Sequence, residues 1–336
     1  MNNSIQFWRW LFTCLVCMLH FEFQYLGGEQ PIFKCCYLAV EFFFILSGFF
    51  MMKHAENHDD SALMYSAGRV KRFYPGLFLS WVLLILNIAF VNDYKLTEIF
   101  DEIKKHIWEY LLMNSLGISW DILNGATWYI SALVISGYFI YWLIKKNKKV
   151  FIQFIAPMLI FFIYSYYAYQ GSGLDYHLEW ERISVSSISR AVGGLCIGCI
   201  TYEISTTHKA LLVKFNMLFY SVVELFALII LAGVLLYGEK NSNNLLVLFA
   251  FPILIAIEYN GNSYLSKIVN SKVSGFLGDL SLTMYLNQVL IIGMFVRLNN
   301  RTSYLYDSIK FLVIVNVFGI VVYCIKNALK LSKSEI

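Results

Sequence analysis

The chain has 336 residues, of which 59% are hydrophobic and only 14% are charged. Ordinary soluble domains carry about 25% charged residues, so this composition excludes a soluble domain of ordinary type and indicates a membrane protein. The formal net charge is +4. A basic cytoplasmic face accounts for a surplus this small, and we expect no nucleic-acid partner.

Apolar segments long enough to span a bilayer recur along the whole chain. A hydrocarbon core about 30 Å thick requires roughly 20 apolar residues in a helix. About ten segments approach this length, near residues 5–25, 36–52, 75–92, 127–144, 150–169, 191–207, 212–237, 243–259, 276–297 and 307–326. The segment at 191–207 is the weakest, because glycines and polar residues interrupt it.

These segments predict an all-α fold, a polytopic membrane helical bundle of about ten transmembrane helices. A barrel is excluded because open sheet edges cannot face lipid and the segments are too long for barrel strands. We find no internal repeat or low-complexity tract. Residues 1–336 are therefore expected to form a single integral membrane domain with no appended soluble domain.

The placement of Lys and Arg predicts the orientation of the bundle. Cytoplasmic loops of membrane proteins carry an excess of these residues. If the N-terminus is cytoplasmic and the spans alternate, the two densest basic clusters, 69–72 and 145–149, both lie inside. Both termini are then cytoplasmic, and the longer loops at about 93–126 and 170–190 lie outside.

The loop at about 93–126 contains an amphipathic pattern. Apolar residues recur there at helical spacing among Asp, Glu and Lys, at Leu96, Ile99, Ile103, Ile107 and Leu111. The pattern predicts a helix. Such a helix would lie on the outside face of the membrane, over the mouth of the bundle.

The first two spans carry ionisable residues at membrane depth. The first contains Arg9 and His20, and the second contains Glu41. Arg9 and His20 project from one face of a helix, roughly 16 Å apart along its axis. Such groups are expensive in a bilayer and indicate function. The Glu41 carboxylate could orient the His20 ring and stabilise its protonated form, or the two could form a buried structural pair.

Arg69 and Arg72 lie on the cytoplasmic side, just before the third span. Their i, i+3 spacing turns both guanidinium groups to one side of a helix, where they suit phosphate oxygens. The competing interpretation is an ordinary positively charged flank of a membrane span. The combination with an intramembrane His and carboxylate favours phosphate binding.

The cysteines and His54 do not indicate a metal site. Cys pairs at 14–17 and 196–199 have CxxC spacing, but each lies in an apolar span, where Cys packs as a small hydrophobe. His54 and His58 are spaced for half of a metal site on a helix. No further ligand is evident, which favours a solvated loop, and we predict no metal.

Five loose motifs, read in chain order, resemble the membrane-bound acyltransferase-3 family. They are the Arg9…His20 helix, the segment at 40–49, Arg69-x-x-Arg72-x-Tyr74-Pro75, and the segments at 127–131 and 278–288. Members of this family acylate surface polysaccharides, lipopolysaccharide, peptidoglycan and other acceptors. The chain departs from the family at Glu41, where Asp is usual, and at Asn287, where His is common. Asn287 cannot act as a base.

The resemblance implies an O-acyltransferase that takes its acyl group from acyl-CoA, with acetyl-CoA the expected donor. Arg69 and Arg72 would grip the phosphates of the donor, and Arg9 would help to hold it or stabilise charge. His20 would serve as general base for the acceptor hydroxyl, oriented by Glu41. Three aromatic residues could line the acceptor or acyl path: Trp128, Tyr129 and Tyr285.

The sequence leaves open whether the acyl group passes through a covalent intermediate. Ser47 is a conceivable carrier, because its hydroxyl lies in the second span close to Glu41. The alternative is that Ser47 and Gly48 pack at a helix crossing, which is a common use of small residues in membranes.

The resemblance also implies a place and an acceptor. We expect a bacterial cytoplasmic (inner) membrane enzyme that contacts membrane lipid and acylates a cell-surface polysaccharide or a lipid-linked glycan precursor, alone or with polysaccharide biosynthesis proteins. The alternative is a polytopic transporter or flippase for a small solute or lipid-linked glycan. Against it, the two halves contain no matched pair of Gly/Pro-interrupted spans. Nothing positive indicates a membrane scaffold or sensor.

Overall fold

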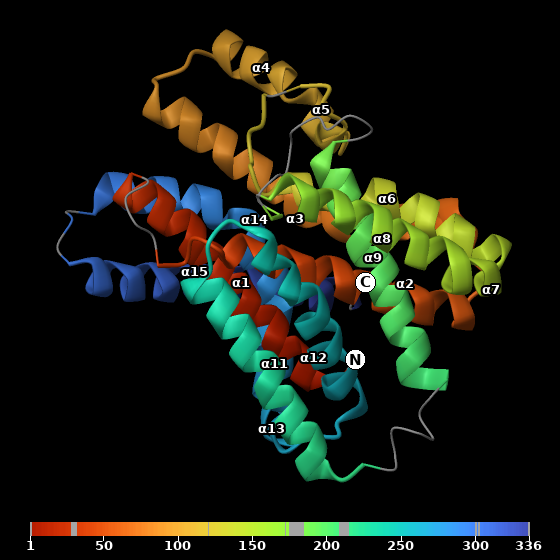
Figure 1. Ribbon diagram of the computed structural model, residues 1–336. Helices are drawn as coiled ribbons and strands as arrows, with labels where there is room; N and C mark the ends of the chain where they lie inside the picture. The colour runs from red at the N-terminus through yellow and green to blue at the C-terminus, as the bar shows by residue number, and fades with distance from the viewer. Residues whose placement is uncertain are drawn as a thin grey trace.

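The computed structural model describes residues 2–27, 32–119, 121–171, 173–174, 185–207, 215–299, 301 and 303–334, with side chains described as far as residue 325. Helices dominate these residues, and none of them forms a strand (Figure 1). The α-helices are α1 (Asn3–Leu26), α2 (Ala39–Asn57), α3 (Ala62–Val91), α4 (Leu96–Lys105), α5 (Ile107–Tyr110), α6 (Thr127–Lys146), α7 (Lys148–Val150), α8 (Ala156–Gln170), α9 (Ser186–Thr207), α11 (Met217–Tyr237), α12 (Val247–Asn260), α13 (Tyr264–Val269), α14 (Lys272–Leu298) and α15 (Tyr304–Ser334). The expected all-α class is confirmed.

Eight helices in the described part of the chain are long and apolar enough to cross a membrane. Their bounds agree to within a few residues with those of eight expected spans. The exception is the start of α3, at Ala62, which lies about four turns before the expected start of the third span. The first and sixth spans were also expected, and α1 and α9 lie there with 24 and 22 residues. Both are long enough but fall outside the eight, because polar side chains lower their hydropathy.

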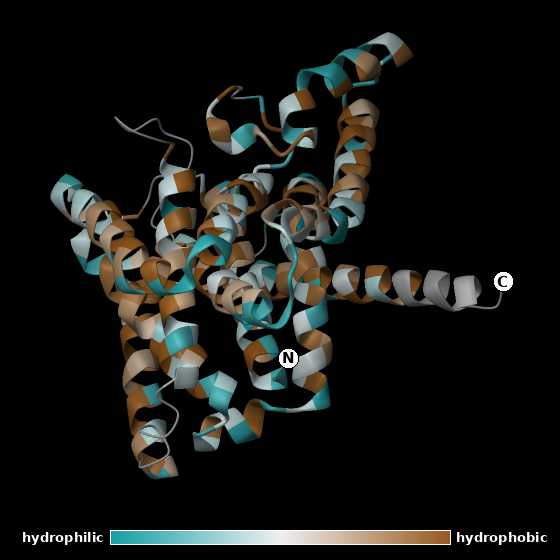
Figure 2. Ribbon diagram, turned by 90° about the vertical axis from the view of Figure 1, so that its right-hand side faces the viewer, coloured by the Kyte–Doolittle hydropathy of each residue, from teal (hydrophilic) through white to brown (hydrophobic). Residues whose placement is uncertain are grey.

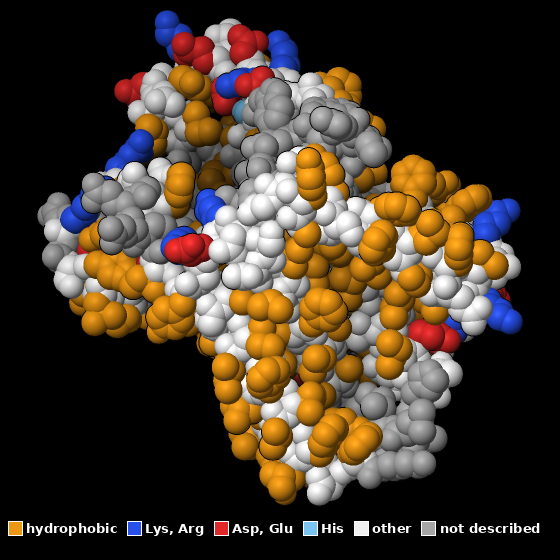
Figure 3. All heavy atoms as spheres, in the orientation of Figure 1, with side chains coloured by type: hydrophobic (Ala, Val, Ile, Leu, Met, Phe, Trp, Pro, Cys, Tyr) orange, Lys and Arg blue, Asp and Glu red, His pale blue; other side chains and the backbone are white. Residues whose placement is uncertain are grey.

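Most helix surfaces that face outward are apolar. Hydrophobic residues run along most helices, and hydrophilic residues concentrate in the connections (Figure 2). Large exposed side chains cover α8 and α11, among them Phe161, Phe162, Leu225 and Phe226 (Figure 3). An apolar exterior of this extent suits contact with lipid, and with the eight apolar helices it makes the chain a multi-pass membrane protein.

Two helix pairs form the centre of the bundle: α2 packs along α9, and α1 packs along α14. The α2–α9 crossing depends on glycine. A Cβ atom on Gly198 would lie 1.9 Å from the Ile45 carbonyl oxygen, and one on Gly48 would lie 2.1 Å from that of Leu195. The backbones approach closely because no side chain separates them. The expected packing role of the Ser47–Gly48 pair is therefore met at Gly48.

The expected amphipathic helix after the third span is present as α4. It has no buried residue, and Leu96 and Phe100 expose 69% and 54% of their surface. In Figure 1, α4 lies beyond the end of the bundle rather than within it. The helix is confirmed, and its position on the membrane surface stays a prediction.

Candidate active site

Two cavities lie inside the bundle, and each contains one half of the expected site. The first has a volume of about 440 Å³ and is lined by residues from α1, α2, α3, α6 and α14. We call it the arginine cavity, because Arg9, Arg69 and Arg72 all line it. The structure therefore brings together Arg69 and Arg72, which were expected to bind phosphate, and Arg9, which was expected to help hold the donor or stabilise charge.

The arginine cavity is strongly cationic. Lys53 lines it together with the three arginines, and no Asp or Glu is found among the described lining residues. The Arg69 guanidinium donates to the Tyr65 hydroxyl at 3.0 and 2.7 Å and also lies over the Tyr65 ring. Arg9 donates to the Gln6 side-chain oxygen at 2.5 Å. An anion with several negative charges suits this cavity.

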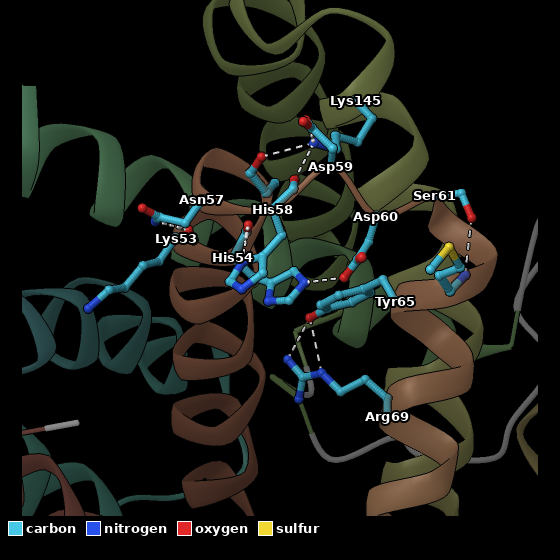
Figure 4. A network of polar contacts seen from close by, with 12 residues as sticks. Lys53, His54, Asn57, His58, Asp59, Asp60, Ser61, Tyr65, Arg69 and Lys145 are labelled. Atoms are coloured by element: carbon cyan, nitrogen blue, oxygen red, sulfur yellow. Dashed lines mark hydrogen bonds and ion pairs between the residues drawn. The ribbon is translucent and has the colours of Figure 1, made fainter.

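A polar network at one end of the arginine cavity holds Tyr65 in place (Figure 4). The Tyr65 ring stacks on Tyr141 with centroids 4.2 Å apart. Beside it, the His54 Nε2 atom lies 2.8 Å from the Asp60 carboxylate, and the His54 ring stacks on His58. These contacts join the end of α2 to the start of α3. The spacing of His54 and His58 therefore serves a structural contact. His54 packs near Tyr65, and Tyr65 in turn accepts the hydrogen bonds that hold Arg69.

The second cavity has a volume of about 650 Å³ and is lined by residues from α1, α2, α3, α6, α9 and α14. We call it the histidine cavity, because His20 lines it. Trp128 and Tyr285, two of the three expected aromatic residues, also line it, while Tyr129 and Tyr285 line the arginine cavity. Each of the three expected aromatic residues therefore lines at least one of the two cavities.

His20 is oriented by Gln288 rather than by Glu41. The His20 Nδ1 atom lies 3.0 Å from the Gln288 side-chain oxygen. In the tautomer that donates its Nδ1 proton to this oxygen, Nε2 keeps its lone pair and is the basic atom. The expected orienting role of Glu41 is therefore corrected, because a neutral amide on α14 contacts the ring and Glu41 pairs elsewhere.

Glu41 pairs with Arg190, a residue that the sequence reasoning missed. The Arg190 Nε atom donates to the Glu41 carboxylate at 2.7 Å, and both side chains are almost completely buried. The Arg190 guanidinium also lies over the Trp128 ring. The expected sixth span began at residue 191, whereas α9 begins at Ser186 and includes Arg190. A carboxylate at membrane depth requires a buried cation, and that requirement was the available signal.

A third carboxylate supports the wall of the histidine cavity from outside the spans. Glu109, on α5, accepts from the Trp81 indole at 2.7 Å and from the Leu123 amide at 2.6 Å. Burial raises the pKa of Glu109, and these hydrogen bonds oppose the shift. The segment it holds includes Ala126, whose carbonyl oxygen accepts from the Tyr285 hydroxyl at 2.8 Å. Glu109 thus helps to fix Tyr285.

The two cavities lie one after the other along α1 and α14, and they share the lining residues Val40 and Tyr285. Along α1 the lining passes from Arg9 and Thr13 in the first cavity to Val16 and His20 in the second. Along α14 it passes from residues 281 and 282, through Tyr285, to residues 289–293. The arginines and His20 therefore lie at successive positions along the bundle, with Arg9 and His20 on the same helix.

The fold and site define a multi-pass helical membrane protein with two neighbouring cavities that contain buried polar side chains. A protein-family model described as an acyltransferase domain, that of acyltransferase family 3, matches residues 2–326. The chain belongs to this family, and it is a membrane acyltransferase. Comparison with curated proteins and with solved structures finds no match.

Proposed function

We propose that the chain is an O-acyltransferase that transfers an acyl group, acetyl in the first instance, from acyl-CoA to a hydroxyl of a cell-surface polysaccharide or a lipid-linked glycan precursor. The observation that carries this proposal is the arrangement of the path. A cavity with three arginines lies at one end and a cavity with an oriented histidine at the other. Donor and acceptor can then meet inside the membrane.

The donor binds in the arginine cavity. Coenzyme A carries several phosphate charges, and guanidinium groups bind phosphate oxygens through charge-assisted hydrogen bonds. Arg69 and Arg72 grip the phosphates, and Arg9 supports them from α1. The basic clusters at 69–72 and 145–149 favour a cytoplasmic position for this end of the path, and acyl-CoA is made in the cytoplasm. Roughly 16 Å of helix separate Arg9 from His20, a span suited to the extended pantetheine arm.

The reaction uses His20 as general base. The Nε2 atom of His20 takes the proton of the acceptor hydroxyl while the hydroxyl oxygen attacks the thioester carbonyl carbon. The carbon–sulfur bond then breaks, and the leaving thiolate takes the proton from the His20 imidazolium. The products are the acyl ester and free coenzyme A. Gln288 keeps the proton on Nδ1 throughout and so keeps Nε2 facing the reaction.

The acceptor enters the histidine cavity from the other side of the membrane. Trp128 lines this cavity, and its ring, over which Arg190 lies, offers an apolar contact for a sugar. With the arginine cavity on the cytoplasmic side, both termini are cytoplasmic, and the protein lies in a bacterial cytoplasmic membrane. Glycan synthesis at this surface supplies the hydroxyl, with or without separate biosynthesis proteins.

The first test is chemical analysis of surface polysaccharide from cells with the wild-type chain, with no chain, or with His20→Ala. Ester-linked acyl groups should appear only with the wild-type chain, because loss of a general base lowers transfer by about 10²–10⁴-fold. As a control, immunoblotting of the membrane fraction should show that His20→Ala is inserted at the wild-type level. In membrane vesicles, acetyl-CoA should release free thiol at a rate that depends on His20.

Two results would contradict the proposal. His20→Ala with wild-type ester content would remove His20 from the mechanism. If the wild-type chain forms no ester and releases no thiol from acyl-CoA, acyl-CoA is not its donor. Transport of a small solute or lipid-linked glycan along the same path would then be the better interpretation.

A further inference from the structure

The two cavities meet at a narrow wall. Val40 on α2 and Tyr285 on α14 line both cavities, and they are the only described residues that do so. We call this pair the throat. Val40 exposes 5% of its surface and Tyr285 exposes 7%, so little open space remains between them and their neighbours. Anything that passes from the arginine cavity to His20 must pass the throat.

The throat is rigid on its Tyr285 side. The Tyr285 hydroxyl donates to the Ala126 carbonyl oxygen at 2.8 Å, and its ring meets the Tyr129 ring edge-on with centroids 5.9 Å apart. Tyr129 packs in turn on Phe44, with centroids 4.8 Å apart. A ring held at both its edge and its hydroxyl cannot turn aside without breaking these contacts.

The throat is also rigid on its Val40 side. Val40 is β-branched, which restricts its χ1 angle. Its neighbour Glu41 is anchored by Arg190, and the close α2–α9 crossing fixes the helix behind it. The width of the opening is therefore set by two side chains whose positions the bundle determines.

We propose that Val40 and Tyr285 select the acyl group by size, so that the physiological donor carries a short, uncharged acyl group such as acetyl. This inference rests on the proposed function, because the thioester must pass the throat to reach His20. Each further methylene must fit between fixed apolar walls, and a single methylene changes discrimination by about 10–200-fold in such a site. A charged group such as succinyl must also lose water against these walls.

The test compares acetyl-CoA with butyryl-CoA in inside-out membrane vesicles from the producing cells, which contain the native acceptor. Free thiol and alkali-labile acyl groups are measured together. Val40→Ala should raise the butyryl-to-acetyl ratio of kcat/KM by at least about tenfold, because two methyl groups leave the throat. Val40→Leu should shift the ratio in the opposite direction. Leu46→Ala, which lines the arginine cavity only, should leave the ratio unchanged.

The outcomes separate the throat from the proposed function. If Val40→Ala and Val40→Leu both transfer acetyl with the wild-type ratio, the throat does not select and the inference is overturned, while the acyltransferase reaction stands. An equal shift in Leu46→Ala also overturns it, because selection then belongs to the cavity as a whole. If the wild-type chain uses neither donor, the proposed function fails, and the inference fails with it.

Discussion

The arginine cavity and the histidine cavity are built in different ways. Two of the three arginines come from one turn of α3, and a short polar network holds one of them, Arg69. At the histidine cavity two polar pairs join distant parts of the chain: His20 and Gln288 are 268 residues apart, and Glu41 and Arg190 are 149 apart. The proposed donor site thus depends in large part on local sequence, whereas the proposed chemistry depends on the assembled bundle. Each prediction below tests one side of this difference.

The largest effect is expected at the Glu41–Arg190 pair. Glu41→Gln leaves Arg190 buried without its carboxylate, which should lower the free energy of unfolding by about 3–5 kcal/mol. The double variant Glu41→Leu with Arg190→Met removes both charges and should recover most of this loss. Thermal unfolding in detergent, measured for Glu41→Leu, for Arg190→Met and for the double variant that combines them, gives the coupling between the two residues.

This cycle has a clear negative outcome. Additive losses in the single and double variants would mean that the two residues do not depend on each other. The histidine cavity would then lose one of the two long-range pairs that distinguish it. Equal acyl transfer by the double variant and the wild-type chain would further assign the pair to stability alone.

The next effect concerns the His20–Gln288 contact. Gln288→Ala removes the acceptor for the His20 Nδ1 proton, and we expect acyl transfer to fall by about 10–100-fold, the usual value of a hydrogen bond to a group that becomes charged. Gln288→Glu keeps an acceptor at the same distance and should restore much of the rate. The KM for acyl-CoA should not change in either variant, because the arginine cavity is intact. A raised KM with an unchanged kcat would contradict the orienting role.

A smaller effect is expected in the arginine cavity. Arg72→Ala should raise the KM for acyl-CoA by about tenfold with little change in kcat, because one charge-assisted phosphate contact is lost. Lys71→Ala removes the same charge from the neighbouring exposed residue, which does not line the cavity, and serves as the matched control. Equal effects in the two variants would show that general positive charge, rather than the cavity, attracts the donor.

The difference between local and long-range features explains what the sequence could and could not predict. Each apolar span is a local pattern, so the helices and the shared face of Arg69 and Arg72 were predictable, whereas the place of Arg9 beside them was expected only from the family resemblance. Gln288 gave no signal, because an amide within an apolar helix indicates no partner by itself. Arg190 was missed because the expected span began one residue after it, although a buried Glu41 requires a cation. Pairs between distant helices depend on packing that single spans do not encode.

The smallest predicted effect separates the ring of Tyr285 from its hydroxyl. Tyr285→Phe keeps the wall of the throat and removes one neutral hydrogen bond to the Ala126 carbonyl oxygen, worth about 0.5–1.5 kcal/mol. Acetyl transfer should therefore fall by no more than about tenfold, and the butyryl-to-acetyl ratio should stay at its wild-type value, because the ring sets the width. If transfer instead fell as far as in His20→Ala, the hydroxyl would take part in the reaction. The boundary between the two cavities would then belong to the chemistry of the histidine cavity rather than to selection of the donor.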